Sequence, residues 1–417
     1  MSVQIGRNGA TAADPILSAR LLLQTPVQQA LGIKPAQKIS ALYSAGAEKT
    51  SPQNSRNHIG YLVLCVLLTV AGILAVWAGN RSYAPEMYAE DGMAGPAAAL
   101  AGGRNYALFD LNVNIRNLRH EHLSRLTQTP DLVLVGASHW QEASAELVPH
   151  LKMYNAHLHR DYWEGPLAIT EMLVEHDRLP KKMIISIRDN QFTPVSARKD
   201  FLWEPDIPFY RAMADRLHIE ADAIWLTLPF NRMREMLSLS MLFKNFTHWQ
   251  NAEERPHATG EKHFESLDVL LPDGSIVWSN QHMRLFTPGR SKAESLKFAA
   301  LNANSPPVID PRGVTAFDEL LTYLKARGVT VYLVNPPFNP IYFDKMQGTP
   351  YAAGLRNVEA LTARFAATHG LQVIGSFNPH KVGCDSTMYI DAEHANAKCL
   401  RKIFDQFAAL DMARGAK

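Results

Sequence analysis

An uncharged apolar run near the start of the chain most constrains what this sequence can fold into. Residues 59–79 read IGYLVLCVLLTVAGILAVWAG and carry no charged side chain. A helix rises about 1.5 Å per residue, so this run reaches roughly 30 Å, enough to cross the hydrocarbon core of a bilayer. It is too long, and too far from the N-terminus, for a cleaved signal peptide. The sequence therefore predicts one transmembrane helix. The alternative is a buried core helix, which rarely lacks polar residues on every face.

Charges on the two sides of this run predict which way it crosses the membrane. Basic side chains dominate before it, against Asp14 and Glu48: Arg7, Arg20, Lys34, Lys38, Lys49 and Arg56. After it, Arg81 is followed by acidic residues: Glu86, Glu90 and Asp91. Positively charged flanks stay in the cytoplasm. We therefore expect a single-pass protein of the inner (cytoplasmic) membrane, with a cytoplasmic N-terminus and a periplasmic or equivalent extracytoplasmic domain.

The rest of the chain divides by composition. Residues 1–58 are rich in Ala, Ser, Gln and Asn without sustained apolar periodicity, which is typical of a mostly disordered tail. Residues 80–104 include GMAGPAAALAGG and indicate a juxtamembrane linker. Residues 105–410 are long enough for one large domain with its own core. We expect this domain to carry the function.

The pattern within residues 105–410 predicts an α/β fold. Short continuous apolar runs, typical of buried parallel strands, occur at residues 132–135, 153–156, 183–187, 329–334 and 371–374. Helical stretches separate them, including residues 139–149 and, at the end, 392–410. This alternation favours a parallel sheet with helices on both faces. Residues 195–310 break it, with helical stretches near 209–218 and 228–246, and are predicted to be an insertion over one end of the sheet.

Composition excludes some functional classes. The net charge is +2 and no basic block recurs, so a nucleic-acid surface is not indicated. The sequence indicates no cofactor. His157 and His159 alternate as on a strand, but a metal site would need a third ligand that the sequence does not supply. We therefore expect no bound metal.

A serine after the first apolar run and an Asp/His pair near the C-terminus are the candidate catalytic residues. Ser138 ends the segment DLVLVGAS, where a small-residue turn after a buried strand would present its hydroxyl. Asp391 and His394 would share one face on the first turn of a helix. We predict Ser138 as nucleophile, His394 as its base and Asp391 as the group that orients the base. The alternative is that Ser138 and Asp391 only cap helices.

Other side chains follow strand ends, where open α/β sheets bind their ligands. Asn335 follows one predicted strand and is a candidate for substrate binding. His139, beside Ser138, is predicted to line the groove rather than to act as a base. Arg188 would contact an anionic or sugar substrate, with a structural salt bridge as the alternative. Aromatic residues suited to stacking on sugars, or simply to packing, are Trp140, Tyr162, Trp163, Trp203 and Trp278.

Two of the three cysteines bracket the Asp/His pair. Cys384 and Cys399 could form a disulfide that clamps this segment in an oxidising compartment. The alternative is two unrelated thiols. Cys65 lies inside the apolar run and is expected to be inert.

These features together resemble the SGNH/GDSL hydrolase superfamily, in which the serine follows the first strand and Asp-x-x-His lies near the C-terminus. The chain is similar to the membrane-anchored branch, which includes the D-alanyl-lipoteichoic acid biosynthesis and alginate O-acetylation proteins. The likeness covers roughly residues 105–410. It rests on the N-terminal transmembrane helix and on the motifs Gly136-Ala-Ser138, Tyr154-Asn155 and Tyr389-Ile-Asp391-Ala-Glu-His394. It implies a three-layer α/β/α domain behind the anchor.

The sequence departs from this superfamily where the oxyanion hole is expected. The family's second block usually carries a glycine, which is absent from Asn155-Ala-His157-Leu-His159. Its third block usually reads Gly-x-Asn-Asp, and here the strand runs into Arg188-Asp189-Asn190. The candidates that remain are the Ser138 backbone N–H and the side-chain amide of Asn155 or Asn190.

The resemblance implies an O-acyltransferase, most simply an acetyltransferase, or an esterase acting on envelope polysaccharide or exopolysaccharide through an acyl-enzyme. It also implies a partner: a multi-pass membrane O-acyltransferase that supplies the acyl group across the bilayer. The alternative is a non-catalytic domain that binds polysaccharide or scaffolds a synthesis complex. A lipid esterase or thioesterase is a third option.

Overall fold

A computed structural model describes residues 52–83, 92–108, 115–198, 206–220, 237–251 and 255–415. The chain divides into two units between Val70 and Ala71. The predicted tail lies outside the described residues up to residue 51, and the predicted helix at 228–246 does so up to residue 236.

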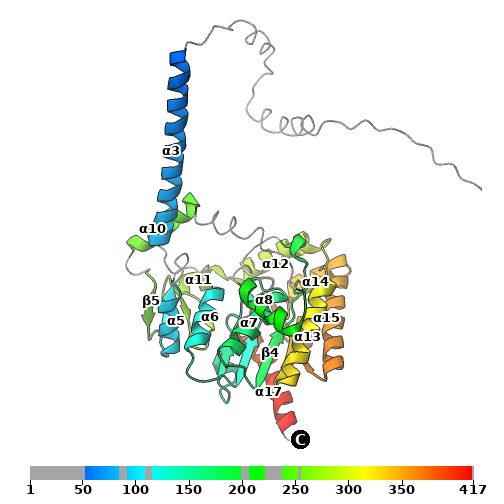
Figure 1. The fold of residues 1–417 in the computed structure, drawn as a ribbon. Helices are drawn as coiled ribbons and strands as arrows, with labels where there is room; N and C mark the ends of the chain where they lie inside the picture. Colours follow the sequence, from blue (N-terminus) through cyan, green and yellow to red (C-terminus); the bar gives the residue numbers. More distant parts are fainter. Residues whose placement is uncertain are drawn as a thin grey trace, which may run out of the picture. The chain divides into compact units, whose positions relative to one another are not determined.

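The apolar run forms a single long helix, α3 (Pro52–Tyr83), which begins before and ends after the predicted residues 59–79 (Figure 1). Its segment Gly60–Tyr83 is long and apolar enough to cross a membrane. Large apolar side chains such as Leu62, Leu67 and Leu68 are more than half exposed. The alternative of a buried core helix is therefore wrong for this segment.

The domain is built on a five-stranded parallel sheet, as the alternating pattern predicts. Its strands are β2 (Leu132–Val135), β3 (Met153–Asn155), β4 (Lys182–Ser186), β8 (Thr330–Asn335) and β9 (Gln372–Gly375), in the spatial order β3-β2-β4-β8-β9. The chain passes outward from β2 to β3 and then back to β4 on the other side of β2. Ligands in open α/β sheets bind beyond the carboxyl ends at such a reversal of strand order.

Helices cover both faces of this sheet, so the domain has three layers (Figure 1). Val133 and Val135 of β2 face one core with side chains of α6 (Ile115–Arg125), α7 (Glu164–Glu175), α13 (Pro311–Ala326) and α15 (Pro350–His369). Leu132 and Leu134 face the other core, which is formed largely by α17 (Ala397–Gly415). The strands read as continuous apolar runs because both faces are buried.

A second sheet, which the sequence pattern did not predict, joins the start of the domain to the insertion. It is antiparallel in the order β5-β1-β6-β7, with β1 (Asn105–Leu108), β5 (His257–Thr259), β6 (Asp268–Leu270) and β7 (Ile276–Val277). Helix α5 (Ala94–Ala101), which lies in the predicted linker, packs against it. Part of the insertion therefore pairs with the strand that precedes the main domain.

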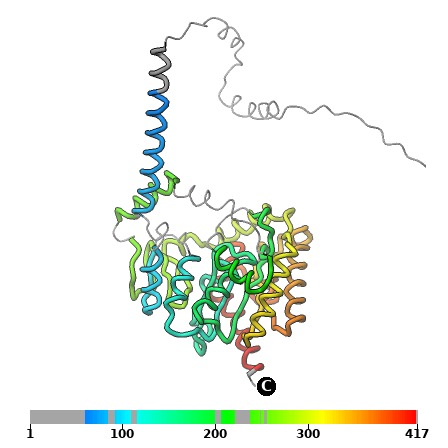
Figure 2. The backbone as a smooth tube through the Cα atoms, in the orientation of Figure 1, coloured from blue at the N-terminus to red at the C-terminus, as the bar shows by residue number. Residues whose placement is uncertain are grey.

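Further helices and 3₁₀ turns complete the described chain, whose backbone path Figure 2 traces from the N-terminal to the C-terminal end. They are α8 (Ile207–Leu217), α10 (Leu239–Gln250), α11 (Asn280–Leu285), α12 (Pro288–Asn302), α14 (Pro340–Met346) and α16 (Pro379–Val382), with 3₁₀ turns η1 (Ser138–Trp140), η2 (Ala145–Leu147), η3 (Val195–Ala197) and η7 (Ser386–Met388). Two helix predictions were wrong. Residues 139–149 form the turns η1 and η2, and the last helix begins at Ala397 rather than at residue 392.

Candidate active site

The fold brings Ser138, His394 and Asp391 together although 256 positions separate the first two. Ser138 Oγ lies 2.9 Å from His394 Nε2, and His394 Nδ1 lies 2.8 Å from Asp391 Oδ2, both within hydrogen-bond distance. Asp391 as acceptor fixes the tautomer that leaves Nε2 free to receive the serine proton. The arrangement is that of a nucleophile, a base and the group that orients the base.

Ser138 is presented by the turn that follows β2. Gly136 permits this turn, because a Cβ at that position would lie 2.6 Å from the Ser186 Cβ and 2.7 Å from Trp140 Cδ1. Ser138 opens η1, whose N-cap is Ala137 and has no side-chain cap. The Ser138 hydroxyl is thus not a helix cap and is directed to the imidazole instead.

Asp391 and His394 lie in a tight loop before α17, and not on a helical turn as the spacing predicted. Asp391 Oδ1 accepts from the backbone N–H groups of Glu393 and His394, both at 2.8 Å. The backbone N–H of Ile390 donates to the His394 carbonyl at 2.9 Å and closes the loop. One carboxylate oxygen therefore shapes the loop while the other holds the ring.

Residues that the sequence did not single out hold this loop in place. Asn339, the N-cap of α14, donates through Nδ2 to the Asp391 carbonyl at 2.9 Å, and its backbone N–H donates to the Ala392 carbonyl at 3.0 Å. Ser291 on α12 donates to the Tyr389 carbonyl at 3.3 Å. Asn339 lies four residues after Asn335, the last residue of β8, and this position after a strand is the sequence signal of its role.

Carboxylates around His394 favour its charged form. Burial alone would lower the pKa of the imidazole, but Asp391, and then Glu393 and Glu142, outweigh burial and raise the pKa of His394 to about 9. Burial also opposes ionisation of Asp391, but His394 and the hydrogen bonds to Oδ1 and Oδ2 hold its pKa well below the usual range. The imidazolium that forms when Ser138 loses its proton is therefore strongly stabilised.

A group of buried polar side chains lies beside the triad. The His139 ring stacks on the His394 ring with centroids 5.5 Å apart, and burial keeps the pKa of His139 well below its usual value. Its Nε2 lies 3.9 Å from Glu393 Oε2, and neither ring nitrogen has a hydrogen-bond partner. His139 is thus a neutral, buried ring against His394, and its place in a substrate groove stays a prediction.

Arg188 belongs to the same group. Its Nε lies 3.8 Å from Asp189 Oδ1, and its guanidinium lies 5.9 Å from the centre of the Tyr162 ring. Burial and Asp189 raise the pKa of Glu393 to about 7, while Arg188 opposes that rise. The contact with Asp189 fits the structural alternative for Arg188, and its role in substrate binding stays a prediction.

Asn155 and Asn335 make structural hydrogen bonds in place of the predicted contacts with an oxyanion and a substrate. Asn155 is fully buried, and its Nδ2 donates to the carbonyls of Trp140 and Ala143 at 2.7 and 2.9 Å. Asn335 Nδ2 donates to the Ile187 carbonyl and to Thr362 Oγ1. The amide of Asn155 is therefore not free for an oxyanion, and the amide of Asn335 is not free for a substrate.

Asn190 and the Ser138 backbone are the oxyanion candidates that remain. Asn190 lies in the turn after β4, at the same carboxyl edge as Ser138, because β2 and β4 are parallel neighbours. Within the described residues its side chain has no hydrogen-bond partner. An oxyanion hole needs such free donors, and losing one typically costs about 3 kcal/mol of transition-state stabilisation.

The insertion reaches the neighbourhood of the triad through Trp278. Its Nε1 donates to Glu142 Oε1 at 2.8 Å, and the pKa of Glu142, which is one of the carboxylates acting on His394, is raised to about 7 by burial. Trp140 and Trp163 are fully buried and act in packing, while Trp203 lies outside the described residues. Trp278 is half-buried and is the aromatic residue tied to the site by a hydrogen bond.

Cys384 and Cys399 form a disulfide, so the alternative of two unrelated thiols is wrong. The bond joins the segment before η7 to the first turn of α17, on either side of the loop that carries Asp391 and His394. A cross-link of this kind restricts the unfolded chain, and its value grows with the length of the closed loop. It therefore favours the loop conformation that carries Asp391 and His394.

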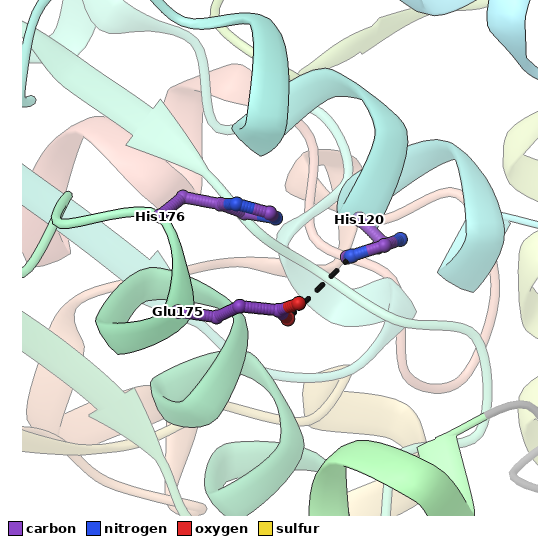
Figure 3. Close-up of side chains that lie close together, drawn as sticks. All are labelled: His120, Glu175 and His176. Atoms are coloured by element: carbon purple, nitrogen blue, oxygen red, sulfur yellow. Dashed lines mark ion pairs between the residues drawn. The ribbon is translucent and has the colours of Figure 1, made fainter.

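Side chains that could hold a metal ion gather away from the triad. Within the described residues, one group of three has ligand atoms within 4.8 Å of one another: His120 on α6 with Glu175 and His176 at the end of α7 (Figure 3). His120 Nε2 lies 3.6 Å from Glu175 Oε2, and its ring packs on Phe209. Two donors on one tetrahedral zinc ion lie roughly 3.3 Å apart. The contact between imidazole and carboxylate is an ion pair when the ring is protonated.

In comparisons with known proteins, no protein family and no curated protein matches the chain. The chemistry must therefore be argued from the site itself.

The carboxylates around His394 make a prediction about pH. His394 acts as a base only when neutral, so ester cleavage should rise with pH through the His394 pKa, near 9. Glu393, with a pKa of about 7, is ionised in that range and favours the charged ring. Glu393→Gln removes this charge, and we expect the midpoint of the pH–rate profile to move down by about one unit, the effect of one nearby charge.

The measurement is the pH dependence of p-nitrophenyl acetate hydrolysis by the full chain in detergent. Glu146→Gln is the matched control, because Glu146 is exposed and pairs with Lys262 rather than with the site. An unchanged midpoint in Glu393→Gln would show that this carboxylate does not act on the base.

Proposed function

We propose that the chain is a membrane-anchored serine acyl-transfer enzyme of the SGNH/GDSL type that acts on an envelope polysaccharide or exopolysaccharide. The observation that carries the proposal is the continuous hydrogen-bonded relay from Ser138 Oγ through His394 to Asp391. Its position supports the proposal too, because the relay lies where the strand order reverses at the carboxyl ends of β2 and β4.

The geometry supports a two-step reaction. His394 Nε2 takes the proton of the Ser138 hydroxyl as its oxygen attacks the carbonyl of an acyl ester. The C–O bond to the leaving alcohol then breaks, and His394 returns the proton to that alcohol, which leaves an ester on Ser138. In the second step His394 takes a proton from a sugar hydroxyl or water, whose oxygen accepts the acyl group and releases Ser138.

The membrane crossing belongs to the same proposal. If α3 spans the inner membrane with its basic flank in the cytoplasm, the catalytic domain faces an oxidising compartment, which agrees with the Cys384–Cys399 disulfide. One helix cannot move an acyl group across a bilayer. A multi-pass membrane O-acyltransferase would therefore supply the acyl group, and polysaccharide would receive or release it.

A non-catalytic role in polysaccharide binding or scaffolding is the second candidate. It is favoured by the commitment of Asn155 to two backbone carbonyls, which leaves fewer donors for an oxyanion. A site kept only for its structure would retain the relay without the reactivity of the serine. The two candidates differ in whether Ser138 reacts with an electrophile.

A fluorophosphonate probe separates the two candidates. The full chain in detergent should be labelled on Ser138, because the relay activates that hydroxyl, and the label should be located by peptide mass spectrometry. Ser138→Ala should abolish labelling, while Ser144→Ala, a change on the nearby turn before η2, should leave it intact. A folded chain that carries no label at Ser138 would favour the scaffold.

A further inference from the structure

Helix α10 carries large apolar side chains that are exposed, and their contact with water would be unfavourable. Large side chains on it are far more exposed than core residues: Leu239 at 58%, Phe243 at 68% and Trp249 at 44%. Ser240, the next residue after Leu239, is also exposed and lies about 100° around the helix from it. α10 is therefore an amphipathic helix, and the described residues of the domain leave Leu239 and Phe243 on its apolar face largely uncovered.

The same helix packs against the last turns of α3. Asn245 Nδ2 donates to Asn80 Oδ1 at 2.9 Å, and Asn80 Nδ2 donates to the Ser238 carbonyl at 3.2 Å. The two helices approach closely at Gly79, where a Cβ would lie 2.5 Å from Leu242 Cδ1. Both asparagine side chains are buried in this contact. α10 thus covers the amide of Asn80, which falls within the segment able to cross a membrane.

Aromatic and basic side chains gather where the two helices meet. The Tyr83 ring contacts the rings of Phe246 and Trp249, with both centroid distances at 5.2 Å. The Arg255 guanidinium lies 5.1 Å from the centre of the Trp249 ring, and Arg81 lies 5.8 Å from that of Trp77. Trp and Tyr collect at the level of lipid headgroups, and basic side chains favour anionic lipid there.

We propose that α10 is a membrane-surface helix, with Leu239, Phe243 and Trp249 inserted into the boundary between headgroups and acyl chains of the bilayer that α3 crosses. The contact with α3 sets the level of α10, because Tyr83 ends the apolar segment and its ring packs on Phe246 of α10. Helices of this type bury their apolar face roughly 5–10 Å into the interface. The inference rests on the proposed membrane crossing of α3 and is independent of acyl transfer.

Such a contact would restrain the catalytic domain at the membrane surface. α10 belongs to the insertion, which also supplies Trp278 beside the triad. A single spanning helix leaves a domain free to tilt, whereas a second lipid contact in the same domain limits that freedom. The proposed acyl donor lies in the membrane, so a domain held against the bilayer would keep its serine within reach.

Nitroxide labels on the full chain test the proposal. In a Cys65→Ser background, where the other two cysteines are joined, single cysteines are placed by Leu239→Cys, Phe243→Cys and, as a matched control on the same helix, Ser240→Cys. Leu67→Cys reports on α3. The labelled chains are inserted in nanodiscs of phosphatidylcholine and phosphatidylglycerol. Collision with oxygen, which concentrates in lipid, is then compared with collision with a water-soluble nickel chelate.

We expect the labels at positions 239, 243 and 67 to favour oxygen and the label at 240 to favour the nickel chelate. Labels at 239 and 243 that match position 240, with position 67 still in lipid, would overturn the inference and leave the crossing intact. That result would favour a membrane protein partner as the cover for this face. A nickel-accessible label at position 67 would overturn both the crossing and the surface helix.

Discussion

Ser138→Ala is expected to lower the rate of ester cleavage by roughly ten-thousand-fold or more, the scale seen when a serine nucleophile of a triad is removed. The methyl group that replaces the hydroxyl cannot attack a carbonyl, and no other hydroxyl is hydrogen-bonded to His394 among the described residues. The measurement is the initial rate of p-nitrophenyl acetate hydrolysis by the full chain in detergent. In cells, the acyl content of the surface polymer should fall to background at an unchanged level of protein.

Two further variants, one control and one change to the proposed base, decide how the Ser138→Ala rate is interpreted. Ser144→Ala should keep the wild-type rate, because Ser144 lies outside the relay. His394→Ala should lose about as much as Ser138→Ala, since residues that act as one unit do not contribute additively. Wild-type ester cleavage and polymer acylation in both Ser138→Ala and His394→Ala would rule out the catalytic proposal and leave the scaffold.

The elements that the sequence predicts well are those fixed by local pattern. The apolar run of α3 and the strands β2, β4 and β8 are recognised from continuous hydrophobic residues: α3 is long and apolar enough to cross a membrane, and two helical layers cover the strands. The second sheet is different. Its strands are short, and β1 pairs with segments that lie about 150 residues later in the chain. No local periodicity reports such a pairing.

In the candidate site, too, local motifs could be predicted from the sequence and their conformation could not. Serine after a strand and Asp-x-x-His are visible in the sequence, and the spacing suggested a helix for the second motif. Side-chain hydrogen bonds decide otherwise, because Asp391 Oδ1 binds two backbone N–H groups and Asn396 Oδ1 accepts from the N–H of Lys398 at the start of α17. Such bonds compete with helix formation and delay its start.

The error over Asn155 has a related cause. An amide beside a predicted nucleophile is a reasonable oxyanion donor by residue type. Whether it is free depends on the carbonyls around it, and the segment after Ser138 forms 3₁₀ turns in place of the predicted helix. Its carbonyls at Trp140 and Ala143 accept both amide hydrogens of Asn155. The oxyanion hole is thus the part of the site that sequence alone predicts least well.

Asp391→Asn is expected to lower ester cleavage by roughly ten-thousand-fold while the fold is kept. The amide oxygen can take the place of Oδ1 and accept from the N–H groups of Glu393 and His394, so the loop should persist. The amide nitrogen then faces His394 Nδ1 and donates to it. His394 must adopt the tautomer with its proton on Nε2, which cannot accept the proton of Ser138.

A ten-thousand-fold loss corresponds to about 5 kcal/mol in activation free energy, at 1.36 kcal/mol per tenfold. Such a loss in a folded variant would show that Asp391 orients His394 and does not merely stabilise the loop. Asp385→Asn is the matched control, because Asp385 makes a similar turn, accepting from the N–H of Thr387 at 2.8 Å, but is exposed. That variant should keep the wild-type rate, and circular dichroism should show both variants folded. A rate for Asp391→Asn within about tenfold of wild type would mean that His394 does not depend on this carboxylate for its tautomer, and the triad assignment would fail.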